Sequence, residues 1–152
     1  MKKLILLITI MLATVASAMT ATEHKLLDTP VVRAQMGKLY DKAAHTFVSG
    51  GPRNEYSFTV NADGSVTPII TSGTADKNKI DVPTGTQTIV HTHPNGTHPQ
   101  PGPNDVTAAQ AADCPNYDLS QDQLWVANID GTTAKVGDVE FKHGEVVIKW
   151  TK

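Results

Sequence analysis

Two histidines and an aspartate in the segment HTHPNGTHPQPGPND, residues 91–105, have the types and spacing of metal ligands. His91 and His93 end the run TQTIVHTH, which has the pattern of a β-strand. Because alternate side chains of a strand point to the same face, the two imidazoles can converge on one ion. Asp105 opens a helical pattern, where the helix dipole favours a carboxylate. Two histidines and one carboxylate leave a fourth tetrahedral position for water, as in catalytic zinc sites.

The other four histidines are weaker candidates. An H-x-H pair also occurs by chance in loops, and a histidine-rich loop can bind metal without any catalytic role. His98 lies in the middle of the loop and is expected to be in solvent. His24 and His45 flank the first predicted helix, and His143 fits a hairpin turn.

The elements before this segment are a helix and a hairpin. The stretch DTPVVRAQMGKLYDKAAHT predicts a helix, with Thr29 as its cap and Pro30 in its first turn. Its apolar residues recur at three- and four-residue spacing: Val32, Met36, Leu39, Tyr40 and Ala43. The alternation in EYSFTV predicts a strand, and NADGS predicts a turn. A second strand is expected in VTPII, at a sheet edge because of Pro68.

After the metal segment, NDVTAAQAAD predicts a short helix with Asn104 as a cap. The remainder, residues 122–150, predicts a β-meander, with tight turns at Asp130-Gly131 and His143-Gly144. No internal repeat or second domain is visible. The sequence therefore predicts a single α+β domain, with a mixed β-sheet flanked by helices and a C-terminal β-meander.

The first eighteen residues have the plan of a secretory signal peptide: two lysines, an apolar run, and Ala16-Ser17-Ala18 as a cleavage signal. The expected domain is residues 19–152, periplasmic or secreted, with no stable membrane anchor after cleavage. Without Lys2 and Lys3, 11 basic and 15 acidic side chains remain, a net charge near −4. This balance argues against nucleic-acid binding, which usually needs a basic face.

Three further residues have ordinary structural explanations. Cys114 has no partner for an intramolecular disulfide, so it is buried, paired with another chain, or reactive, and burial is the expected state. Trp125 and Trp150 lie in strand patterns and are expected in the core.

The sequence HTHP, a proline- and glycine-rich loop and an aspartate that opens a helix together resemble the JAMM (MPN-type) zinc metallopeptidases. NEYSFTV followed by a DG turn resembles the glutamate strand of small bacterial members of that family. The resemblance covers roughly residues 30–128. It implies a cytidine-deaminase-like sandwich, a zinc ion held by His91, His93 and Asp105, and Glu55 as the general acid–base.

Two features depart from the family pattern of H-x-H, seven residues, serine, two residues and aspartate. Eleven residues separate His93 from Asp105, where the family has ten. Aligning from the aspartate places Gly102 at the serine, whose hydroxyl helps to hold the oxyanion in the family. Keeping the spacing rigid instead places Pro101 at the serine and Asn104 at the aspartate. We prefer the first alignment because it retains a carboxylate ligand, with Gly102 as the possible oxyanion position.

Three functions follow from these residues. The first is an exported zinc hydrolase that cleaves a peptide or isopeptide bond in a peptide or protein substrate, with Glu55 assisting attack by a zinc-bound water. The second is a non-catalytic, metal-dependent interaction module on the same fold, which the absence of the serine favours. The third is a periplasmic metal-buffering protein whose histidine loop takes up zinc or copper.

Overall fold

The computed structural model describes residues 25–52, 54–71, 80–94 and 98–151. The predicted signal peptide, residues 1–18, lies outside the described residues. Within them, no helix has both the length and the apolar character needed to cross a membrane.

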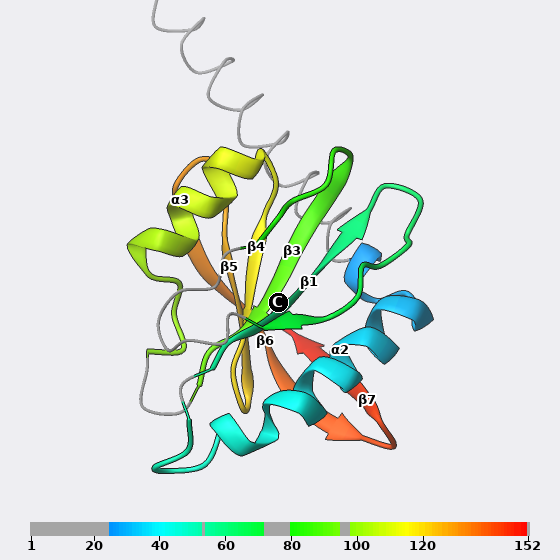
Figure 1. Cartoon of the computed structure of the whole chain (residues 1–152), viewed down its shortest axis with the longest axis vertical. Helices are drawn as coiled ribbons and strands as arrows, with labels where there is room; N and C mark the ends of the chain where they lie inside the picture. The colour runs from blue at the N-terminus through cyan, green and yellow to red at the C-terminus, as the bar shows by residue number, and fades with distance from the viewer. Residues whose placement is uncertain (1–24, 53, 72–79, 95–97, 152) are drawn as a thin grey trace, which may run out of the picture.

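Seven strands form one curled, mixed sheet in the order β2-β1-β3-β4-β5-β6-β7 (Figure 1). Only β3 and β4 pair in parallel, and every other neighbouring pair is antiparallel. The strands are β1 (Tyr56–Asn61), β2 (Ile70–Thr71), β3 (Thr86–Thr92), β4 (Asn116–Leu119), β5 (Gln123–Ala127), β6 (Thr133–Lys142) and β7 (Glu145–Trp150). The predicted mixed α+β domain and its C-terminal meander, β5 to β7, are confirmed.

Helix α2 (Pro30–Ala43) covers one face of the sheet, as the apolar spacing predicts. Its residues Val32, Met36 and Leu39 are fully buried in the main core, which also takes in alternate residues of the central strands, such as Val90 and Tyr117. Pro30 occupies the first turn as expected. Thr29 has the extended backbone of an N-cap, but its hydroxyl donates to the carbonyl of Leu26 instead of capping the helix.

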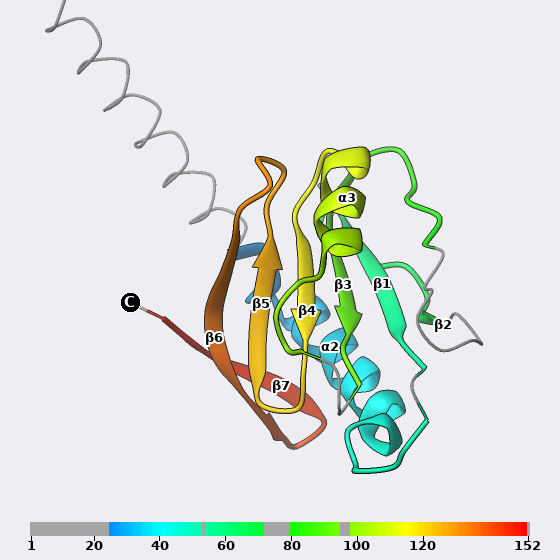
Figure 2. The same ribbon diagram turned by 90° about the vertical axis from the view of Figure 1, so that its left-hand side faces the viewer.

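Helix α3 (Pro103–Ala112) lies on the opposite face (Figures 1 and 2). Two parallel neighbours need a crossover connection, and α3 provides it between β3 and β4. Ala109 and Cys114 are buried at the C-terminal end of this crossover, so the expected burial of Cys114 is confirmed. The crossover brings the carboxyl ends of β3 and β4 and the N-terminus of α3 together.

The sequence patterns miss one strand and predict another to be longer than it is. The four-residue β4, which joins the two halves of the sheet, was not predicted. The strand expected in VTPII is reduced to β2, and Val66 makes only an isolated bridge to Val60. Pro68 lacks an N–H donor, which explains the interruption, and β2 does lie at the sheet edge.

The two predicted tight turns are confirmed, with positive φ at Gly131 (87°), His143 (53°) and Gly144 (81°). The tryptophans are only partly buried, so they are less central to the core than expected.

Candidate metal centre

Four side chains from three elements meet at the carboxyl ends of the parallel strands. His91 and His93 come from β3 and the residue after it, Asp105 from α3, and Asp118 from β4. One ligand atom from each lies within 4.8 Å of all the others, so the group can hold a metal ion. The structure thus brings together all three ligands expected from the sequence and adds a fourth, Asp118.

The backbone accounts for each of these positions. His91 and His93 project from the same face of β3. Asp118 pairs with His91 in the parallel ladder, which puts the carboxylate directly beside the imidazole. Asp105 is the third residue of α3, and its Oδ2 accepts a 2.7 Å hydrogen bond from the N–H of Gly102, the N-cap residue. The helix start therefore fixes the Asp105 carboxylate above the strand ends.

The two imidazoles face both carboxylates at nearly equal distances. His91 Nε2 lies 3.3 Å from Asp105 Oδ1 and 3.2 Å from Asp118 Oδ1. His93 Nε2 lies 3.5 Å from Asp105 Oδ2 and 3.5 Å from Asp118 Oδ2. Zinc bonds of about 2.0–2.1 Å separate neighbouring tetrahedral ligand atoms by about 3.3–3.4 Å. The observed distances match that edge and exceed the 2.7–2.9 Å or so of a direct charge-assisted hydrogen bond.

The other ring nitrogen of each histidine has a carbonyl partner. His91 Nδ1 donates to Asn116 Oδ1 at 2.9 Å, and His93 Nδ1 donates to the backbone carbonyl of His98 at 2.8 Å. Asn116 Nδ2 donates to the carbonyl of Asp105 at 3.3 Å, which fixes the orientation of the amide. These bonds keep one proton on each Nδ1 and turn the Nε2 atoms towards the cluster, as in most metal-ligating histidines.

The interior of the cluster has the polar atoms that a cation would satisfy. Among the described residues, His91 Nε2 and both carboxylate oxygens of Asp118 are buried without a hydrogen-bond partner. Asp118 is fully buried, and unpaired buried charge is costly. Two imidazoles and two carboxylates suit a divalent transition metal, so the residues fit such an ion.

The ionisation of the four groups is strongly coupled. Burial disfavours the charged form of His91, but Asp118, Asp105 and Glu55 together raise the pKa of this histidine to about 10. Burial raises the pKa of Asp118 to about 6, against the opposite effect of the two histidines. Burial also opposes ionisation of Asp105, yet the two adjacent histidines hold its pKa far below the ordinary value. The site thus favours a positive charge among the carboxylates.

Glu55, the expected general acid–base, lies at the edge of this cluster. Ser57 pairs with His91 in the antiparallel ladder, and the same register carried back two residues places Glu55 opposite His93. Residues opposite one another share a sheet face, so Glu55 belongs to the face that carries the histidines. Its charge contributes to raising the pKa values of both His91 and Asp118, which requires proximity.

Gly102 and His98 have roles other than direct ligation. The N–H of Gly102 donates to Asp105 Oδ2 and positions that carboxylate, and Gly102 as the oxyanion position stays a prediction. The side chain of His98 is exposed, as expected, but its backbone carbonyl orients His93.

Sequence reasoning missed Asp118 and Asn116 because it missed β4. The available signal was topological: a strand followed by a helix can return as a parallel neighbour of that strand. In PNYDLS, Tyr117 and Leu119 alternate with three polar residues, and this pattern fits a short strand with one apolar face.

A scan against protein-family models and searches of the curated proteins and of the solved structures find no match to this chain.

Proposed function

We propose that this protein is an exported zinc-dependent hydrolase of the JAMM type, acting on a peptide or isopeptide bond. The observation that carries the proposal is the cluster of His91, His93, Asp105 and Asp118, in which His91 Nε2 and both carboxylate oxygens of Asp118 are buried without a hydrogen-bond partner among the described residues. A nearby glutamate, Glu55, supplies the acid–base group that such a reaction needs. Export rests on the pattern of residues 1–18.

Zinc is the proposed metal, held by His91, His93 and Asp105, with Asp118 as a fourth donor. Imidazole and carboxylate donors at tetrahedral spacing suit Zn²⁺. Asp118 is the most deeply buried of the four, whereas Asp105 is 20% exposed. A substrate would therefore approach from the side of α3 and Asp105.

Zinc, when bound, polarises a carbonyl group and lowers the pKa of a coordinated water. Glu55 would take a proton from the attacking water and return it to the leaving amine. Asn116 and the carbonyl of His98 would keep the imidazoles oriented while the charge around them changes.

Two observations favour a second candidate function, a non-catalytic metal-binding interaction module. Four protein donors can complete a tetrahedral shell, and closed shells are typical of structural zinc sites. The N–H of Gly102 is committed to Asp105, and one missing oxyanion donor costs about 10²–10³ in rate. Catalysis would then require a fifth coordination position or release of one carboxylate.

Zinc content and hydrolysis of the mature protein test the proposal. Purified without a histidine tag, it should contain one zinc per chain. Asp105→Ala should lower the zinc content, whereas Glu55→Gln should keep the zinc and abolish hydrolysis of a broad panel of peptides and isopeptides. Full zinc content without hydrolysis by the wild type would establish the interaction module instead. A protein that takes up no zinc at micromolar concentration would refute both candidates.

A further inference from the structure

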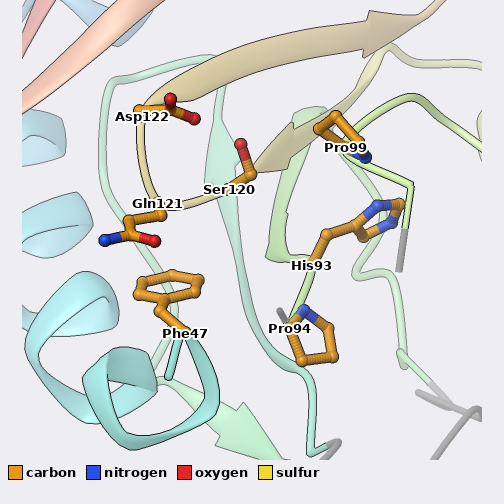
Figure 3. A pocket seen from close by; sticks show the side chains of 7 residues that line it. All are labelled: Phe47, His93, Pro94, Pro99, Ser120, Gln121 and Asp122. Atoms are coloured by element: carbon orange, nitrogen blue, oxygen red, sulfur yellow. The ribbon is translucent and has the colours of Figure 1, made fainter. Parts of the chain in front are cut away.

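A pocket of about 150 Å³ opens next to the metal centre, and His93 forms part of its wall (Figure 3). One wall comes from His93, Pro94 and Pro99. The facing wall comes from the segment after α2 and the β4–β5 turn, with Phe47, Ser120, Gln121 and Asp122. Because His93 is shared, an occupant of the pocket would lie beside the proposed metal.

The volume suits one side chain and not a whole ligand. Pockets for drug-sized ligands measure about 300–1,000 Å³. A cavity of about 150 Å³ is large enough for a single benzene molecule. The pocket therefore has the capacity of a subsite that receives one residue of a longer substrate.

The lining combines apolar walls with an acidic rim. Phe47, Pro94 and Pro99 offer carbon surface, and Asp122 is an exposed carboxylate. Among the described residues that line the pocket, none is a lysine or an arginine. The neighbouring Glu55 and the two aspartates of the metal centre add further negative charge, which exceeds the charge of one divalent ion. An aliphatic stem that ends in a cation matches both features.

Tyr40 and Val139 hold the wall that carries Asp122 in place. The ring of Tyr40 contacts that of Phe47, with centroids 5.0 Å apart, and its hydroxyl donates to the carbonyl of Gln121 at 2.9 Å. The N–H of Val139 donates to the carbonyl of Asp122 at 2.9 Å. Burial and the charge of Asp122 both raise the pKa of Tyr40, so the carboxylate lies close to the phenol. A wall held in this way needs little reordering on binding.

We propose that this pocket binds a lysine-like side chain of the substrate, with Asp122 as the counter-ion of its ammonium group. The proposal rests on the proposed function, because it assigns the residue that is held beside the bond to be cleaved. Substrates with an acidic residue at that position would be disfavoured.

The test is an NMR titration of the zinc-loaded protein with the hydroxamates of lysine, norleucine and glutamate. Norleucine has the same aliphatic stem as lysine but no ammonium group. We expect lysine hydroxamate to bind about threefold to fivefold more tightly than norleucine hydroxamate, with the glutamate compound weakest. Amide shifts should concentrate at Ser120, Gln121 and Asp122.

Asp122→Asn should equalise the affinities for the lysine and norleucine compounds, and Asp122→Lys should favour the glutamate compound. Asp113→Asn is the matched control: it removes one exposed carboxylate at the far end of α3, where asparagine tolerates the positive φ of 52°. No binding, equal affinities in the wild type, or a lysine preference that survives Asp122→Asn would overturn the subsite. If the protein hydrolyses peptides but shows no preference for the lysine compound, the proposed function stands and the subsite does not. If the preference depends on Asp122 but there is no hydrolysis, the lysine-binding pocket stands and the hydrolase does not.

Discussion

Asp118 and His91 are direct neighbours across the parallel strands β3 and β4, and Asp118 Oδ1 lies 3.2 Å from His91 Nε2. Both side chains are almost completely buried. The strand pairing itself places this carboxylate against this imidazole, so the contact does not depend on a loop. Asp118 is therefore a fixed part of the candidate metal centre, and replacing it tests whether the cluster binds zinc.

Replacing Asp118 with asparagine should weaken zinc binding by more than about tenfold. The amide keeps the shape of the side chain but removes the negative charge that attracts Zn²⁺. Competition with a chromophoric chelator measures the affinity, and Asp113→Asn is again the control for loss of one carboxylate. Zinc affinity within about threefold of the wild type would show that Asp118 is not a ligand, leaving the three-ligand site expected from the sequence.

Asn116→Ala should lower zinc affinity by about 10–100-fold, although Asn116 touches no metal. Its Oδ1 accepts a hydrogen bond from His91 Nδ1, and partners of this kind orient the ring and raise its basicity. The matched control is Asn128→Ala, in the β5–β6 turn, where the side-chain amide donates to the hydroxyl of Thr132. Similar zinc affinity in the two variants would mean that the orientation of His91 is set by packing alone.

The zinc-free protein should lose stability as the pH rises from about 7 towards 10. The pKa of His91 is raised from the ordinary 6.5 to about 10, so the native state binds a proton that the unfolded state releases. That contribution is complete below 6.5 and is lost as the pH rises through 10. The raised pKa of Asp118, about 6, lies below this window and adds no slope within it.

Thermal denaturation with a chelator and with excess zinc distinguishes the two states. Bound zinc takes the place of the proton, so the zinc-loaded protein should show no such decline and should release protons on binding at pH 7. Zinc at 100 times its dissociation constant should add about 2.7 kcal/mol. A zinc-free protein whose stability rises between pH 7 and 9 would contradict the assigned ionisation of His91.

The sequence alone predicts the site residues whose positions follow from a single strand or a single helix. The alternation in TQTIVHTH places His91 and His93 on one face, and the helix start places Asp105 beside them. Asp118 could not be found in this way, because its contribution depends on which strand pairs with β3. That pairing is determined by the crossover through α3, and β4 itself is only four residues long, with Asn and Asp, which are poor strand formers.

The hydrogen bond from the Gly102 N–H to Asp105 also could not be predicted from the sequence alone. From the sequence, a glycine at the serine position offers a free backbone donor. In the fold, Gly102 is the N-cap of α3, and its N–H is the group that holds the third-residue carboxylate. The start of α3 therefore uses the Gly102 N–H to position the Asp105 carboxylate.

Gly102→Ser should leave folding and zinc affinity unchanged and supply the hydroxyl that the family pattern contains. Gly102 has φ of −83° and extended ψ, so serine meets no backbone strain there. This extended backbone is also the one that a residue before a proline, here Pro103, prefers. An added Cβ contacts only Asp105 Oδ2, at an ordinary 3.5 Å. Serine is also a better N-cap than glycine by a few tenths of a kcal/mol or so, so denaturant unfolding should show equal or slightly higher stability.

If folding and zinc binding are unchanged, the hydrolysis rate of the Gly102→Ser variant measures the effect of the added hydroxyl alone. If its absence limits catalysis, Gly102→Ser should raise the rate on the peptide and isopeptide panel, by up to about 10²-fold, and Gly102→Ala should not. Alanine is the matched control because it adds the same Cβ without the hydroxyl. A folded, zinc-loaded Gly102→Ser variant with no hydrolysis would show that a serine at this position does not restore catalysis, and the interaction module would become the better description of the protein.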